Sequence, residues 1–289
     1  MLTAEIMSTI KQLEIHTKRL VRGTLMGETR STLKGVGFDF DQIREYQLGD
    51  DVRSIDWNSS ARVNKVLVKQ YCEERSRTLM LLVDVSASSF YGSRDAVKYH
   101  LFAQVASVLA LVASYGKDSV SLLLFSDEVE KFIPPSKGSA HVHMIMRTLF
   151  SYKPARKKTN ISKALEYVAR LKRKDMLVFL ISDAIDTGFD KNMKLVARKN
   201  DLIVIRAEDE RERELPSVGF IAMQDIETGQ EVTIDLRSKH LAMHNSVLKN
   251  RLHVQQSEYK KYGIDWIYLN QRQQYITTLV QFFRRRVTR

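Results

Sequence analysis

Two short, fully apolar runs constrain the fold of this chain more than any other feature. Leu79–Val83 and Met176–Ile181 contain no polar residue, and each is followed at once by acidic and hydroxyl side chains. Apolar runs of this length, without alternation, are typical of strands that are buried on both faces. A strand covered on both faces requires helices on the two sides of its sheet, so the runs indicate an α/β architecture.

The rest of the chain after residue 78 alternates between strand and helix patterns. Further strands are predicted at 120–125, 129–133, 202–205 and 264–269, with apolar-periodic helices between most of them. The connection at 126–128 is too short for a helical crossover, so 120–125 and 129–133 should form an antiparallel pair. We therefore predict a doubly wound, mainly parallel, Rossmann-like sheet with one antiparallel edge strand.

Two regions of the chain are expected. Residues 1–77 should form an N-terminal extension packed on the core, with a helix to about residue 34 and then loops and short strands around buried Tyr46 and Trp57. Carboxylate–arginine pairs should hold these loops together. Val63–Tyr71 alternates apolar and polar residues as a half-buried strand does. Residues 78–289 should form the α/β domain, with a β-hairpin insertion near 219–235.

The chain is basic, with 46 lysine and arginine residues against 34 aspartate and glutamate residues and a net charge of +12. Ten of the basic residues fall between Arg147 and Lys174, where Glu166 is the one acid. This segment could attract an acidic protein or a nucleic acid. A solvated helix face with its loops is the favoured interpretation, because neither interleaved aromatic residues nor zinc-finger spacing accompanies the charge.

The remaining bulk features favour a cytoplasmic location. No run approaches the roughly 18 apolar residues of a membrane span. The first 20 residues are amphipathic and lack the apolar segment of a signal peptide. A single cysteine excludes an internal disulfide and fits a reducing compartment.

Oxygen-bearing side chains gather where the two apolar runs end. Asp84, Ser86 and Ser88 alternate after the first run, Asp183 follows the second, and Thr159 lies at the start of a predicted helix. The carboxyl ends of neighbouring strands are where open α/β sheets bind ligands, so these side chains should converge. Carboxylate and hydroxyl oxygens suit Mg²⁺, or alternatively Mn²⁺ or Ca²⁺, rather than zinc. Taken singly, an aspartate after a strand is often a turn former, and Thr159 or Asn160 would serve as a helix cap.

These five positions resemble the metal-ion-dependent adhesion site (MIDAS) of von Willebrand factor A (vWA) domains. More closely, the segment from about Arg22 to Gly92, including GFDFDQIREYQLGDDVRSIDW and LMLLVDVSASSFYG, resembles the DUF58 family of bacterial proteins. The likeness continues loosely through ETGQEVTIDL and YGIDWIYLNQ. The sequence motifs upstream of the apolar run make the resemblance specific, whereas D-x-S-x-S alone is a weak signal.

The resemblance implies a non-enzymatic role in metal-bridged protein–protein contact, often beside a MoxR-type AAA+ ATPase in assembly or chaperone-like work. It also implies that Ser86, Ser88 and Thr159 touch the metal, and that Asp84 and Asp183 bind it directly or through water. A partner's acidic side chain would complete the metal shell. Lys157 and Lys158 replace glycines found in many relatives, and they would weaken metal binding if they pointed inward.

Enzymatic alternatives have less support. A metal-dependent hydrolase or nuclease remains the rival interpretation, together with nucleic-acid binding through residues 147–174. The chain has neither a G-x-S-x-G nucleophile turn nor a Walker A loop. A two-metal nuclease needs further carboxylates to hold ions about 4 Å apart, and Asp186 is the one obvious extra. We therefore expect no catalytic residues.

Overall fold

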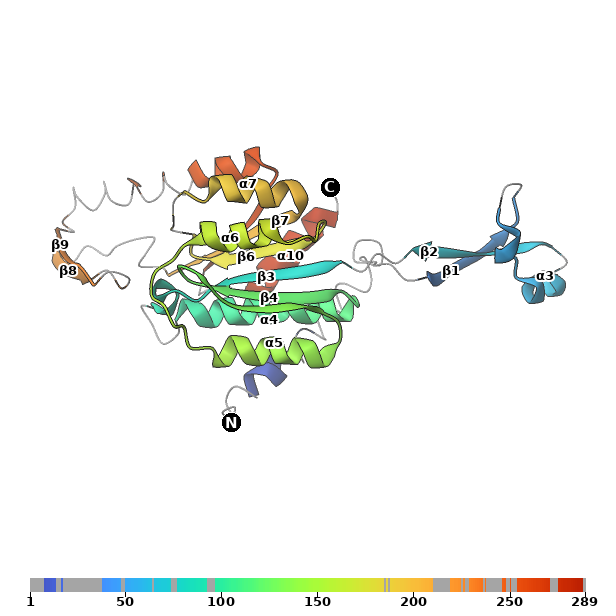
Figure 1. Ribbon diagram of the computed structural model, residues 1–289, viewed down its shortest axis with the longest axis horizontal. Coiled ribbons are helices and arrows are strands. Elements are labelled where there is room, and N and C mark those ends of the chain that lie inside the picture. The colour runs from blue at the N-terminus through green and yellow to red at the C-terminus, as the bar shows by residue number, and fades with distance from the viewer. Residues whose placement is uncertain are drawn as a thin grey trace.

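A six-stranded sheet forms the centre of the computed structural model (Figure 1). Its strands are β3 (Thr78–Asp84), β4 (Ser119–Phe125), β5 (Val129–Ser136), β6 (Leu177–Ser182), β7 (Asp201–Glu208) and β10 (Asp265–Asn270). The order across the sheet is β10-β7-β6-β3-β4-β5, and every neighbouring pair is parallel except β4 and β5. The prediction of a doubly wound, mainly parallel sheet with one antiparallel edge strand is confirmed.

The structure describes most but not all of the chain. The described residues are 8–13, 17, 38–47, 50–63, 65–73, 77–92, 97–184, 186, 188–209, 219–224, 226, 229–235, 237, 246–247, 250, 254–270 and 275–287. Most of the helices expected at 1–34 and 240–261 lie outside these residues. Within the first, residues 8–13 are helical, and Ile10 and Leu13 join the buried core of the sheet.

Helices cover both faces of the sheet. One face packs against α4 (Lys98–Tyr115), α5 (Ser139–Ser151) and α10 (Tyr275–Val287). The other face packs against α6 (Ile161–Arg170), α7 (Asp190–Lys199) and the helical residues 254–261. Figure 1 shows α4 and α5 on one side of the strands and α6 and α7 on the other.

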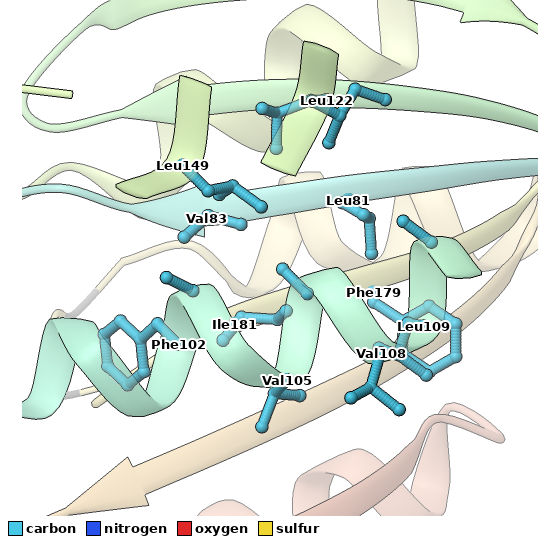
Figure 2. Close-up of a cluster of buried hydrophobic side chains, with 14 of the residues drawn as sticks. Leu81, Val83, Phe102, Val105, Val108, Leu109, Leu122, Leu149, Phe179 and Ile181 are labelled. Carbon is cyan, nitrogen blue, oxygen red and sulfur yellow. The ribbon is translucent and has the colours of Figure 1, made fainter. Parts of the chain in front are cut away.

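Strand β3 is buried along its whole length because it lies between these two helical layers. Leu81 and Val83 point into the layer shared with α4, while Met80 and Leu82 point into the layer shared with α6 and α7. Figure 2 shows Leu81 and Val83 on β3 and Val105 on α4 among the side chains of this first layer. Full burial of each such side chain contributes about 1.5–3 kcal/mol, which explains why the residues between Thr78 and Asp84 are all apolar.

The N-terminal region forms a separate two-stranded sheet. β1 (Phe38–Glu45) pairs antiparallel with β2 (Leu67–Glu73), and the short 3-10 helix η2 (Val52–Ser54) and α3 (Trp57–Val63) lie between them in sequence. The predicted carboxylate–arginine pairing is present, since Arg44 contacts Asp50 through two hydrogen bonds of 2.7 Å. In Figure 1 this sheet and α3 extend beyond the end of β3, away from the helices that cover the core. The predicted division at residue 77 and the packing of residues 1–77 on the core stay predictions.

Three expectations for this region are wrong. Trp57–Val63 is a helix rather than loop, because the Asp56 carboxylate accepts hydrogen bonds from the backbone N–H groups of Asn58 and Ser59 and so caps it. The strand therefore begins at Leu67 instead of Val63. Trp57 is 65% exposed instead of buried, and Ser60 is the one buried residue of this short helix.

The predicted hairpin insertion is confirmed. β8 (Phe220–Gln224) and β9 (Glu231–Asp235) pair antiparallel with Phe220 opposite Asp235 and form a small sheet of their own.

Candidate functional site

Adjacent strands bring the two predicted carboxylate positions to one edge of the sheet. β3 and β6 are parallel neighbours with Val83 opposite Ile181, so Asp84 and Ser182 are the next residues in register. The Ser182 hydroxyl donates to Oδ2 of Asp84 at 2.7 Å. Asp84 is fully buried and Asp183 is 2% exposed. Both carboxylates therefore lie at the carboxyl edge of the sheet, below its surface.

The turn after β3 is organised by the Asp84 carboxylate. Its Oδ1 accepts hydrogen bonds from the backbone N–H of Ser86 at 2.9 Å and from the Ser86 hydroxyl at 2.6 Å. The Ser86 and Ser88 hydroxyl oxygens lie 3.0 Å apart. Ser86 is buried and Ser88 is partly exposed, so the hydroxyl pair leads from the carboxylate towards the surface.

Backbone hydrogen bonds hold the Thr159 loop against this turn. The N–H of Ala87 donates to the carbonyl of Lys157 at 2.9 Å, and the N–H of Asn160 donates to the carbonyl of Ser126 at 2.9 Å. Thr159 lies between these two attachments and is partly buried. Asn160 is the side chain that caps α6, because its Oδ1 accepts from the N–H of Lys163 at 3.0 Å. Of the two cap candidates, the structure therefore selects Asn160.

The lysines beside Thr159 do not enter the site. The side chains of Lys157 and Lys158 are both exposed to solvent. Long lysine side chains that reach water keep their charge hydrated, so these two ammonium groups add little to the potential around Asp84.

A different lysine, which sequence reasoning missed, contacts the site directly. The Lys98 ammonium donates to Oδ2 of Asp183 at 2.9 Å, and the lysine side chain is fully buried. Lys98 is the first residue of α4, where the positive end of the helix disfavours a cation. The Asp183 carboxylate compensates for this position. The signal in the sequence was weak: a single lysine in the first turn of an otherwise apolar helix.

Burial shifts the acidity of the other carboxylate. Burial, and then the negative charge of Asp183, raises the pKa of Asp84 from 3.8 to about 6, against the opposing effect of the hydrogen bonds from Ser86 and Ser182. Burial and the neighbouring Asp183 both disfavour the charged form of Asp84. A cation beside Asp84 would favour the charged form.

The donor set fits a hard cation in ligand type. Carboxylate and hydroxyl oxygens are the ligands of Mg²⁺ and its relatives. In the described part of the chain, no group of three or more His, Cys, Asp and Glu side chains is arranged to hold a metal, so a cation here would depend on the hydroxyls of Ser86, Ser88 and Thr159. Lys98 already neutralises Asp183, which leaves Asp84 as the carboxylate with the greater need for a cation.

Comparison with protein-family models gives one match. Residues 42–251, well over half of the chain, match the model described as "Protein of unknown function DUF58". The chain belongs to the DUF58 family. An uncharacterized protein of Mycobacterium tuberculosis is 28% identical to this DUF58 chain over 236 residues, which cover 80% of the chain and 74% of the relative.

Solved structures resemble the DUF58 chain more weakly. The conserved hypothetical protein BatB from Bacteroides thetaiotaomicron matches with a TM-score of 0.49 and 12% identity over 74% of this chain and all of that one. The SpRpn10 VWA domain matches with a TM-score of 0.34 and 11% identity, over 46% of this chain and 75% of that one. Both TM-scores are below 0.5, so the fold of the DUF58 chain rests on its own strand order and strand directions.

The additional carboxylate considered for a nuclease contacts the start of α6. Oδ2 of Asp186 accepts a hydrogen bond from the N–H of Ile161 at 2.8 Å. Asp186 therefore stabilises that helix end.

The basic segment of the DUF58 chain, residues 147–174, is exposed to solvent and runs from one edge of the sheet to the other. All ten of its lysine and arginine residues are exposed. Arg156 pairs with Glu128 near the carboxyl edge of the sheet, whereas Arg173 donates to Thr78 at the opposite edge. Lys163 and Arg170 lie on α6 between these two edges, and Arg170 pairs with Glu166 at 2.5 Å. This arrangement favours the solvated-face interpretation over a nucleic-acid interface.

Within the described residues, none of the helices combines the length and the apolar character that crossing a membrane requires.

Proposed function

We propose that this protein is a metal-ion-dependent protein–protein interaction module with a MIDAS-type Mg²⁺ site, at which Mn²⁺ or Ca²⁺ are the alternatives. The single observation that carries the proposal is the open-sided oxygen cluster. A buried carboxylate, Asp84, is fixed by Ser86 and Ser182, and the Ser86–Ser88 hydroxyl pair leads from it to the surface.

Each side chain has a stated role in this proposal. Ser86, Ser88 and Thr159 contact the cation through their hydroxyls, and Asp84 and Asp183 bind it directly or through water. Lys98 keeps Asp183 in place and neutralises it. The donor set then carries little net negative charge, so a partner's carboxylate adds attraction where a fully anionic set would repel it.

The partner that we propose is a MoxR-type AAA+ ATPase offering an acidic side chain, and the setting is the cytoplasm. The family resemblance in the upstream segment supports the choice of ATPase, and the single cysteine supports a reducing compartment. The exposed lysines 157 and 158 border the Thr159 loop and favour an acidic partner surface.

The same geometry supports a non-catalytic role. In the described part of the chain, no group of three or more acidic, histidine or cysteine side chains is arranged to hold metal ions, which weighs against a two-metal nuclease. Arg156 and Arg170 of the basic segment pair with acidic side chains, which weighs against nucleic-acid binding through residues 147–174.

The test is a pulldown from native lysate with tagged protein, in Mg²⁺ and in EDTA, followed by mass spectrometry. Ser88→Ala removes a partly exposed hydroxyl of the site, and Ser151→Ala, at the exposed last residue of α5, is the matched control. Recovery of an AAA+ ATPase with Mg²⁺ by the wild type and the control, but not by Ser88→Ala, is expected. Equal recovery in EDTA contradicts metal dependence, and recovery of other proteins alone contradicts the proposed partner.

A further inference from the structure

Lys98 is the one fully buried lysine in the described part of the chain. Lysine side chains are almost never fully buried unless an acidic group pairs with them, and here the ammonium donates to Oδ2 of Asp183 at 2.9 Å. Asp183 is itself 2% exposed and is one of the proposed metal ligands. The proposed metal site therefore has a lysine in direct contact with one of its ligands.

The backbone holds Lys98 close to the turn after β3. The N–H of Lys98 donates to the carbonyl of Tyr91 at 3.0 Å, and the N–H of Tyr91 donates to the carbonyl of Ser88 at 3.2 Å. The neighbouring rings of Phe90 and Tyr99 stack with their centroids 4.6 Å apart. Exposed lysines can turn their charge out into water, but Lys98 is anchored at its backbone and buried along its side chain, so its charge stays at the site.

The ion pair lies beside the Asp84 carboxylate. β3 and β6 are neighbouring strands, the Ser182 hydroxyl contacts Asp84 at 2.7 Å, and Asp183 is the residue after Ser182. Neighbouring strands lie about 4.8 Å apart, and unit charges at such separations interact strongly where little water screens them. A cation held by Asp84 and the hydroxyls of the turn is therefore within the influence of the Lys98 charge.

A fixed positive charge at this position affects two kinds of ligand in opposite directions. It disfavours a divalent cation, because like charges repel and because Asp183 is already neutralised. It favours an anionic group from a partner, because its attraction adds to that of the cation. A neutral oxygen, such as an amide carbonyl, gains little from it. The ammonium therefore lowers the affinity for the metal and raises the preference for a carboxylate.

We propose that Lys98 sets the ligand preference of this site: it weakens the binding of Mg²⁺ by itself and selects a carboxylate over a neutral oxygen as the partner's ligand. Lys98 acts through its charge and through Asp183, so it is a positioning residue and not a metal ligand. The inference rests on the proposed function, since it concerns the same site. An acidic side chain on the partner is then a requirement of the site itself.

The test measures two affinities separately in the full chain. Calorimetry gives the Kd of Mg²⁺. NMR titration of the Mg²⁺-saturated chain gives the Kd of N-acetyl-glutamate methylamide, with the neutral N-acetyl-glutamine methylamide as the comparison. Lys98→Gln removes the charge and keeps a side chain that can donate to Asp183. We expect this variant to bind Mg²⁺ about tenfold more tightly and the glutamate probe about fivefold more weakly, as is usual for coupling between two bound groups, with no change for the glutamine probe.

The opposite signs separate the effect of the charge from a structural role, because a distorted site would weaken both ligands. Lys98→Arg restores the positive charge and should bind Mg²⁺ more weakly than Lys98→Gln does. Lys174→Met removes an exposed lysine just before β6, at the opposite edge of the sheet, and should change neither affinity.

Failure of the inference and failure of the proposed function give different results. Unchanged or weaker Mg²⁺ binding by folded Lys98→Gln, or unchanged binding of the glutamate probe, overturns the inference and leaves the proposed function standing. Absence of Mg²⁺ binding by the wild type overturns the proposed function and the inference with it.

A second pair of variants covers loss of folding in Lys98→Gln, as judged by circular dichroism. The comparison is then between Asp183→Asn and Asp183→Asn with Lys98→Met, the second of which leaves neither buried charge unpaired. The double variant should bind Mg²⁺ about tenfold more tightly than Asp183→Asn alone. Equal binding, or binding by neither, overturns the inference.

Discussion

Lys98 and Asp183 form a buried ion pair, with the ammonium nitrogen 2.9 Å from Oδ2 of the carboxylate. The two residues are 85 positions apart in sequence and come from the start of α4 and the end of β6. The pair places a fixed positive charge inside a site that the sequence describes as purely oxygen-bearing.

Removing one member of this pair should destabilise the fold strongly. Lys98→Met leaves the Asp183 carboxylate buried without its counter-charge, and we expect a loss of about 3–5 kcal/mol in the free energy of unfolding, measured in urea. Adding Asp183→Asn to the same chain should recover part of the loss, because no buried charge is then left unpaired. A loss below about 1 kcal/mol in Lys98→Met would show that the pair contributes little.

Magnesium should stabilise the wild-type protein. A ligand that binds only the native state adds stability by mass action, about 2.7 kcal/mol at one hundred times its Kd. The melting temperature should therefore rise with Mg²⁺ and return to its starting value with EDTA, and Asp84→Ala should abolish the response. An identical response in both proteins contradicts the assignment of the site.

The lysines beside Thr159 should have little influence on that binding. Lys157 and Lys158 are exposed, so solvent and salt screen their charge. Replacing both by glycine should change the Mg²⁺ affinity by less than about twofold, measured by calorimetry at 0.15 M salt. A much tighter site in this variant would mean that the two ammonium groups act on the cation after all.

Ionisation of Asp84 should make stability depend on pH. Its pKa is about 6 in the folded chain and near the ordinary 3.8 when unfolded, so the folded state binds more protons between these values. The unfolding free energy contributed by this group therefore falls as pH rises from about 4 to about 6, and is level above about 7. The wild type measured against Asp84→Asn isolates the effect, since other groups titrate in both. A constant difference across the window contradicts the raised pKa.

Thr159 and Asn160, the two polar residues at the start of α6, should have different roles: Thr159 in metal binding and Asn160 in helix stability. Asn160→Ala removes the cap of the helix and should cost about 1 kcal/mol of stability. Thr159→Ala should cost less, and should instead reduce the stabilisation by Mg²⁺. Chemical unfolding of both variants with and without the metal is the measurement. The opposite pattern would make Thr159 a structural residue.

Much of the fold could be predicted from the sequence because the apolar runs mark strands that are buried on both faces. β3 and β6 are covered on both faces, so their residues cannot alternate between apolar and polar. The antiparallel β4–β5 pair followed from the length of its connection.

The errors have identifiable physical causes. Trp57 was expected in a core because large aromatic residues usually are, but among the described residues α3 buries only Ser60 and leaves the ring exposed. The start of α3 had a local signal, Asp56 followed by residues that tolerate a helix, which the apolar pattern of the following segment obscured. Lys98 had no comparable signal, because its partner is set by how α4 sits on the sheet and not by nearby sequence.

The central place of β3 has a consequence for how the protein is made. This strand leaves the ribosome before either of its neighbours, and β6 is completed only about one hundred residues later. During synthesis, the hydrogen bond from Ser182 to the Asp84 carboxylate therefore cannot form until nearly two thirds of the chain has been translated. Such distant pairings slow folding, so the nascent chain must keep its most apolar strand shielded over this interval.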